Sequence, residues 1–260
     1  MSEMDINKRM KVHVLGCYGA PALGKNTTAF LLDDATLIDG GTIISVLNEK
    51  SLSKIRRIFL SHAHLDHIKD IPFFISAARA WYKDLPIEIY ALESVIEALD
   101  EHLFNGVIWP DFYRLPDKAP LMKYVPILPE TPITVGDMTL TLVMVNHTVP
   151  CAGMLIEKNG KTLAYSADTI TTDRLWELAS QRDLSGMIVE VSFPSEEAEA
   201  AKVTRHYTPG VLVKDLVKLK QKVPLLIFHL KPEYEDLIRS QLDKLDFKLH
   251  VAEQGRTYVF

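Results

Sequence analysis

Four potential metal ligands lie within six residues of the chain: His62, His64, Asp66 and His67. A single histidine near the end of a strand is usually a satisfied polar residue, but three imidazoles this close repel one another when protonated. Metal binding explains that cost, because neutral imidazole and carboxylate are preferred ligands of zinc, iron and related ions. The spacing therefore predicts a metal site in this segment.

The backbone around the cluster decides how the four ligands can be shared. Ile55–Leu60 is typical of a buried strand, so the ligands follow a strand end. On a helix, residues two apart point about 200° away from each other, whereas alternate residues of an extended chain face the same way. We therefore expect His62 and His64 to converge on one ion and Asp66 and His67 to reach the other side. Each of the two half-sites then lacks ligands.

Three further candidates follow predicted strands in the second half of the chain, namely His147, Asp168 and His229. Strand ends often collect on one rim of a sheet, so these residues can converge although they are distant in sequence. Each alone would more often be structural. Together they supply a third histidine to each half-site and a carboxylate that can bridge them.

Composition restricts the class of protein. The 260 residues are 47% hydrophobic and 24% charged, with a net charge of −5. This balance indicates a globular chain. It argues against binding of long nucleic acids, because such binding requires a strongly basic protein surface. A small anionic substrate stays compatible, because bound metal can reverse the local potential.

The chain shows no signal peptide and no apolar run near the ~20 residues that span a bilayer. Its two cysteines, Cys17 and Cys151, provide no disulfide framework and are expected to be reduced, buried fillers rather than ligands. We expect a cytoplasmic protein without a membrane partner.

No break in composition separates two autonomous domains, so we expect one domain over residues 1–260. Two β-rich halves, each backed by helices, favour an α+β fold in which two mixed sheets pack face to face with helices outside. The expected strands cover 11–16, 27–32, 35–39, 55–60, 87–92, 139–145, 153–157, 161–166, 186–191, 225–229 and 248–252. The expected helices cover 43–53, 68–83, 93–104, 172–182, 196–203, 209–221 and 233–245.

Residues 105–132 differ from the rest because they hold six of the fourteen prolines together with several aromatic side chains. Proline removes backbone donors and interrupts regular elements, so the sequence predicts a long irregular loop. Such a loop could cover a site, stack on a ligand, form a dimer contact or simply pack on the surface.

The ligand order resembles the signature of the metallo-β-lactamase superfamily: the cluster at 62–67, then His147, Asp168 and His229. Asp39-Gly40-Gly41 also matches the aspartate–glycine strand end that precedes this signature. The resemblance extends from about Val12 to His229. It implies an αββα sandwich with two metal ions on one edge, and an Asp39 that orients the histidine loop.

Finer motifs resemble class II 3′,5′-cyclic-nucleotide phosphodiesterases. They are the segments 104–112, 190–194, 204–209 and 229–232. Three positions depart from that pattern: Asp70 replaces a small residue, Pro72 an aliphatic one, and Tyr207 a leucine. These departures touch the helix after the ligand loop and the pocket edge, so they bear on substrate preference more than on metal binding.

This resemblance implies a mechanism. His62, His64 and His147 would hold one ion, Asp66, His67 and His229 the other, and Asp168 would bridge them. A hydroxide between the ions would attack the phosphorus of a 3′,5′-cyclic nucleotide, cAMP before cGMP, and release the nucleoside 5′-monophosphate. The histidine-rich shell favours zinc, with manganese and iron as alternatives.

His206 is not needed as a metal ligand, yet it lies in a motif that recurs in related phosphodiesterases. We predict that it contacts the phosphate or protonates the leaving oxygen. The alternative is that it caps the helix beginning near Pro209. Substrate contacts are also expected from Asn105, Trp109 and Phe112, and the chain is expected to form a homodimer.

Other functions remain open at this point. A tRNA 3′-processing endonuclease shares the ligand order, but the acidic charge argues against it. Thioester and lactone hydrolases leave the His206 motif unexplained, and His64 argues against a diiron oxygen- or nitric-oxide-reducing site. A metal-binding scaffold protein is the non-enzymatic alternative, although its usual sign, missing ligands, is not seen.

Overall fold

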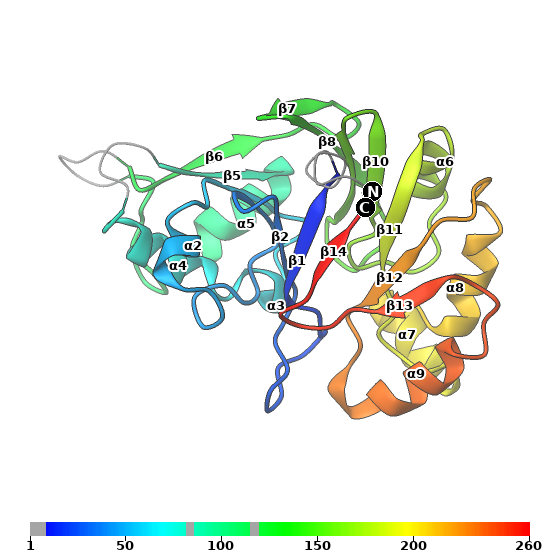
Figure 1. Ribbon diagram of the computed structural model, residues 1–260. Helices are drawn as coiled ribbons and strands as arrows, with labels where there is room; N and C mark the ends of the chain where they lie inside the picture. Colours follow the sequence, from blue (N-terminus) through cyan, green and yellow to red (C-terminus); the bar gives the residue numbers. More distant parts are fainter. Residues whose placement is uncertain (1–8, 82–85, 115–119) are drawn as a thin grey trace.

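Two β-sheets packed face to face form the centre of the molecule (Figure 1). The computed structural model describes residues 9–81, 86–114 and 120–260. Within them each sheet has seven strands, in the orders β14-β1-β2-β3-β4-β5-β6 and β13-β12-β11-β10-β9-β8-β7. The first half of the chain builds the first sheet and the second half the other, except that the last strand, β14, returns to pair with β1.

The first sheet is antiparallel around β1 and parallel from β3 to β6. Its strands are β1 (Lys11–Gly16), β2 (Ala29–Leu32), β3 (Thr36–Ile38), β4 (Arg57–Phe59), β5 (Ile87–Ala91), β6 (Met122–Pro126) and β14 (Thr257–Val259). Because β3, β4, β5 and β6 run in one direction, their carboxyl ends lie along the same rim.

The second sheet is antiparallel from β7 to β10 and parallel from β10 to β13. Its strands are β7 (Ile133–Val135), β8 (Met138–Met144), β9 (Ala152–Lys158), β10 (Lys161–Tyr165), β11 (Leu184–Glu190), β12 (Leu225–Phe228) and β13 (Leu249–Val251). The Asn159–Gly160 turn joins β9 to β10 with positive φ at both residues, as a tight hairpin requires.

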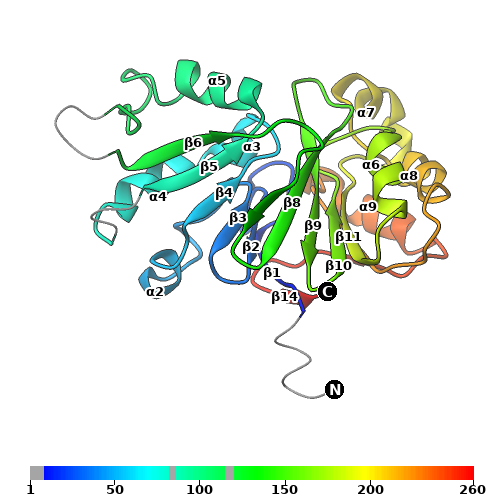
Figure 2. The same ribbon diagram turned by 90° about the horizontal axis from the view of Figure 1, so that it is seen from above.

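Helices cover the outer face of each sheet, so the layers follow the predicted αββα order (Figure 2). Beside the first sheet lie α2 (Glu49–Leu52), α4 (Ile71–Ala78) and α5 (Glu93–His102); beside the second lie α6 (Arg174–Ser180), α7 (Ala198–Thr204), α8 (Pro209–Leu216) and α9 (Glu235–Leu242). The short α3 (Leu65–Ile68) follows β4, and two single 3₁₀ turns occupy Ser195–Glu197 and Pro232–Tyr234.

The hydrophobic core has two parts because each sheet is buried on both faces. One part fills the space between the sheets and beneath α4 and α5, where Phe30, Tyr165 and Phe228 form a group of aromatic contacts. The other lies under α6, α8 and α9, around Trp176 and Leu212. This double burial is the reason for near-continuous apolar strands such as β12.

Several element predictions need correction. The expected helix 43–53 is reduced to α2, and the expected helix 68–83 is divided into α3 and α4. The division falls at Asp70, whose carboxylate accepts a hydrogen bond from Ile43 N while its own N–H donates to Gly40 O. Tyr82 and Lys83, at the end of that expected helix, lie outside the described residues.

The proline-rich segment is not irregular throughout. Residues 122–126 form the edge strand β6, which pairs in parallel with β5, and Pro126 stands at its end. An edge strand tolerates proline because one side of its backbone needs no partner. The strands β7 and β14 were not predicted either, because three residues give too short a periodic signal.

Candidate metal centre

The predicted ligands meet at one rim of the sandwich, where strands from both sheets end. His62 follows β4, His147 follows β8, Asp168 follows β10 and His229 follows β12. Near two of these ends, and at the end of β3, the chain adopts a left-handed conformation: Ala167 (φ 52°), His229 (φ 70°) and Asp39 (φ 56°). Such conformations cost free energy in residues other than glycine, so the surrounding contacts must hold them in place.

A three-histidine half-site is formed by His62, His64 and His147. His147 Nε2 lies 3.1 Å from His64 Nδ1, and the His62 and His64 rings are 4.6 Å apart. His62 Nε2 lies 3.6 Å from Asp168 Oδ2. His62 is fully buried, whereas His64 is partly exposed, so this half-site opens to solvent on the His64 side.

A mixed half-site is formed by Asp66, His67 and His229. His67 Nε2 and His229 Nε2 are 3.2 Å apart, and Asp66 Oδ2 is 3.1 Å from His229 Nε2. Asp168 Oδ2 stands 3.3 Å from His67 Nε2 and 3.2 Å from His229 Nε2. Asp168 therefore faces both half-sites, and one ligand atom from each member lies within 4.8 Å of the others.

The chain direction through the cluster explains this sharing. His64 has an extended conformation (φ −67°, ψ 145°) and precedes α3, which brings Asp66 and His67 into its first turn. His62 and His64 thus share one half-site, and the turn into α3 directs the next two ligands to the other, as the spacing predicted. Gly41 permits the turn, because a Cβ at this position would overlap Asp66 O.

Asp39 holds the ligand loop from below. Its Oδ2 lies 2.8 Å from His67 Nδ1 and accepts a hydrogen bond from the Tyr165 hydroxyl, while Oδ1 accepts one from Ser61 N. The Ser61 hydroxyl donates to Asp39 and lies 3.0 Å from His62 Nδ1. This network holds a proton on Nδ1 of His62 and of His67 and directs each Nε2 at the site.

A second support lies on β11 and its end. His229 Nδ1 is 2.8 Å from Ser192 Oγ, and the Ser192 hydroxyl donates to Glu190 Oε2. Glu190 is fully buried and its Oε1 lies 2.9 Å from His206 Nδ1. Glu190 therefore orients His206 directly and His229 through Ser192.

Glu190, Ser192, Ser61 and Tyr165 are supporting residues that sequence reasoning did not assign. The sequence did carry a signal for two of them. Glu190 and Ser192 belong to the 190–194 motif and lie two residues apart at the end of a predicted strand. Alternate residues at a strand end face the same side. Tyr165 and Ser61 gave no such signal, since each resembles an ordinary strand residue.

His206 is nearly buried and lies over both half-sites. Its ring is 5.1 Å from that of His147 and stacks on His229 at 5.3 Å. Arg205, in a left-handed conformation, ends α7 and turns His206 toward the site. The capping alternative is wrong, because Thr208 caps α8 by accepting from Val211 N.

The side chains of the two half-sites differ in proton affinity. Burial lowers the pKa of His62 well below its usual range, and burial with a nearby His206 lowers that of His147 to about 4. Burial also acts on His67, but the carboxylates of Asp168 and Asp39 outweigh it and raise its pKa well above the usual value. Despite burial, His229 and His67 hold the pKa of Asp168 well below normal.

The donor set fits divalent metal ions. His62 Nε2 and Asp168 Oδ1 are buried and have no hydrogen-bond partner among the described residues, and both belong to residues of the cluster. Buried polar atoms without partners are costly unless something binds them. The separations of 3.1–3.6 Å between ligand atoms also suit bonds of about 2.0–2.2 Å to one shared ion.

The three predicted substrate contacts lie on the segment after α5. The Asn105 side chain donates to Glu101 O and accepts from Val107 N and Ile108 N, so it shapes its own turn. Trp109 packs against Phe73 with ring centres 4.8 Å apart, and Phe112 lies 6.2 Å from Phe104. None has a contact with the metal ligands within the described residues.

The two cysteines are buried, unpaired and outside the ligand cluster. Cys151 donates to Asp168 O and Cys17 to Ala252 O, and burial raises the pKa of both thiols. Thiols in this state are poor metal ligands, because the thiolate is the binding form.

Among the described residues, none of the helices combines the length and the apolar character that a membrane span requires.

Comparisons with known proteins agree with this geometry. The beta-lactamase superfamily domain matches residues 43–229. A probable 3′,5′-cyclic-nucleotide phosphodiesterase of Yersinia pestis is 31% identical over 79% of this chain and 68% of its own length. Ribonuclease Z of Methanococcus maripaludis is 23% identical over 78% of this chain and 80% of its own length.

A solved structure has the same fold. The metallo-beta-lactamase fold protein YhfI of Bacillus subtilis superposes with a TM-score of 0.80 at 24% identity, covering 97% of this chain and all of that one.

Proposed function

This chain belongs to the metallo-β-lactamase superfamily of hydrolases, and we propose that it is a two-metal phosphodiesterase acting on 3′,5′-cyclic nucleotides. The observation that carries the proposal is the position of Asp168 between two complete half-sites. A mononuclear site would leave one group of buried ligands without a purpose. The similarity to a probable cyclic-nucleotide phosphodiesterase supports the choice of substrate.

The residues define which groups would hold the ions. His62, His64 and His147 would hold one, Asp66, His67 and His229 the other, and Asp168 would contact both. Two bound divalent ions supply an activated water and neutralise charge on the phosphate. We propose zinc from the histidine-rich donor set, with manganese or iron as the alternatives.

His206 is the candidate acid for the leaving group. Hydrolysis breaks the bond between phosphorus and the 3′ oxygen, and that oxygen must receive a proton. Glu190 fixes the His206 ring through Nδ1 and outweighs the effect of burial, so the pKa of His206 is raised. A histidine of raised pKa keeps its proton near neutral pH and can donate it from Nε2.

The partly exposed members of the cluster indicate how substrate approaches. His64 and Asp66 are partly exposed, whereas His62, His67 and Asp168 are buried. The open side therefore lies along the rim, where a small phosphodiester could enter. We propose cAMP as the main substrate and cGMP as a second one, and we keep the homodimer as a proposal.

A substrate panel tests this proposal. Purified protein loaded with zinc would be incubated with cAMP, cGMP, bis-p-nitrophenyl phosphate, a precursor tRNA and a thioester, each with and without chelator. We expect chelator-sensitive conversion of the cyclic nucleotides to 5′-monophosphates. Cleavage of precursor tRNA without cleavage of cyclic nucleotides would assign the chain to the ribonuclease Z activity instead.

A further inference from the structure

An apolar groove opens on the same rim as the metal centre and is not used by the mechanism above. It lies between the start of α5, the end of β6 and the end of β8, and its volume is about 520 Å³. Leu92, Pro126, Leu128 and Met144 supply apolar surface, and Glu93 and Glu97 line one side. Pockets for small organic ligands have this size and character.

Strand register places the groove beside the three-histidine half-site. Leu60 N donates to Tyr90 O, so β4 and β5 remain paired up to the ligand loop. β4 ends at Phe59 and β5 at Ala91, so His62 and Leu92 each lie just beyond the paired residues. Since paired strands are about 4.8 Å apart, the groove begins close to the segment that carries His62.

The other wall of the groove is fixed in the same way. Met144 pairs with Ala152 at the end of β8, and Ala152 N donates to Ser61 O across the two sheets. Met144 therefore lies two strand spacings, about 10 Å, from the segment that holds His62. His147 follows Met144 by three residues, so both walls of the groove adjoin metal ligands.

The surface of the groove suits a flat aromatic ring with N–H donors. Leu128 and Met144 are 73% and 42% exposed, so with Pro126 they present an apolar surface that a ligand can cover. Glu93 and Glu97 lie one helical turn apart on α5, where like charges destabilise a helix. Neither carboxylate has a side-chain partner within residues 9–81, 86–114 and 120–260.

We propose that this groove is the subsite for the nucleobase of the substrate, a purine with an exocyclic amino group. The inference rests on the proposed function and extends it to the base. The apolar walls contact the faces of the ring, and the carboxylates of Glu93 and Glu97 accept hydrogen bonds from the amino group. The same carboxylates repel additional phosphates, so a mononucleotide is favoured over a polynucleotide.

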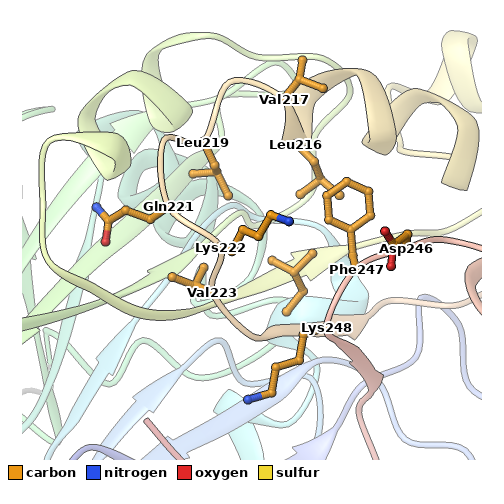
Figure 3. Close-up of a pocket in the computed structure, with 10 residues that line it drawn as sticks. Leu216, Val217, Leu219, Gln221, Lys222, Val223, Asp246, Phe247 and Lys248 are labelled. Atoms are coloured by element: carbon orange, nitrogen blue, oxygen red, sulfur yellow. The ribbon is translucent and has the colours of Figure 1, made fainter.

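A second groove, also lined in part by apolar side chains, serves as the comparison (Figure 3). Leu216, Val217 and Phe247 surround it, and Leu225, another lining residue, begins β12. His229 follows the other end of β12, about 13 Å away at the rise of an extended strand. A substitution here should leave substrate binding unchanged.

The test compares two substrates of the same enzyme, cAMP and ribose 3′,5′-cyclic phosphate, which has the same cyclic phosphodiester but no base. We expect Leu128→Asp and Met144→Asp each to raise KM for cAMP about tenfold, because a charge would face the ring. The kcat/KM for ribose 3′,5′-cyclic phosphate should stay within about twofold. Val217→Asp, an exposed aliphatic residue of the second groove, is the matched control and should change neither.

The carboxylates are tested with purine riboside 3′,5′-cyclic monophosphate, which lacks the amino group. Wild type should bind it more weakly than cAMP, and Glu93→Ala/Glu97→Ala should remove that difference. If the wild type cleaves cAMP but the groove variants have the same KM for cAMP as the wild type, the subsite is overturned while the proposed function stands. If wild type cleaves only bis-p-nitrophenyl phosphate, the proposed function fails and the subsite with it.

Discussion

The three-histidine half-site and the mixed half-site share Asp168 but differ in their side-chain chemistry. His62 and His147 have lowered pKa values and are neutral, so they present lone pairs without losing a proton. In the mixed half-site, the pKa of His67 is raised by Asp168 and Asp39, and that of Asp66 is lowered to about 2, mainly by His229 acting against burial. An ion must displace a proton there.

This difference follows from the supports. His62 is oriented by the neutral Ser61 hydroxyl, and His147 Nδ1 lies 3.2 Å from a backbone oxygen, that of Arg205. His67 is oriented by the carboxylate of Asp39 instead. A carboxylate partner makes an imidazole more basic, and therefore a stronger ligand that also holds a proton more tightly. The two half-sites thus differ in the proton affinity of their ligands.

The largest effect is expected where the two half-sites meet. Asp168→Asn removes the charge that both share, and turnover should fall about a thousandfold or more, since metal charge stabilisation is worth several kcal/mol. Metal content per chain, measured by plasma emission, should fall as well. Asp183→Asn, an exposed aspartate paired with Lys161, is the control and should retain full activity and metal.

The next largest effect is expected for a residue that acts in turnover but not in metal binding. His206→Ala should lower kcat by about a hundredfold to a thousandfold, because a positioned proton donor is lost, while both ions stay bound. The exposed His102→Ala is the matched control. Unchanged turnover, or loss of one ion, would show that His206 acts in another way.

The ligands could be predicted from the sequence because each follows a recognisable strand. His147, Asp168 and His229 were placed at strand ends, and those strands exist. The supports were harder to find, since the role of Glu190 depends on the turn that brings His206 back across β11. Likewise, β6 was hidden by the prolines around it, and the division between α3 and α4 depends on a contact between Asp70 and the distant Ile43.

A smaller effect should distinguish the two supports. Asp39→Asn should weaken metal affinity of the mixed half-site by about 10–100-fold, because His67 loses its carboxylate partner. Ser61→Ala should act mainly on the three-histidine half-site through His62. Competition with a chromophoric chelator measures both affinities; equal losses in the two variants would mean that the half-sites are not supported separately.

The smallest effect is the twofold change in metal content expected on acidification. The pKa of His67 in the folded protein is raised above its ordinary value of about 6.5. In the metal-free protein, protonation of His67 therefore stabilises the fold at pH values below about 6.5. This contribution is lost as the pH rises through the pKa of the folded state. Metal binding displaces this proton, so affinity at the mixed half-site falls as the pH falls. Between about pH 8 and about pH 5 the chain should lose one of two ions. Simultaneous loss of both ions would contradict the proposed difference between the two half-sites.

Both half-sites must be filled for hydrolysis if Asp168 has to hold two ions. A zinc titration checks this: zinc is added stepwise to chelator-treated protein while conversion of cAMP to 5′-AMP is followed by phosphorus NMR. We expect little activity until the first equivalent is bound and a maximum at two equivalents per chain. Full activity at one equivalent, or activity in the metal-free protein, would contradict it.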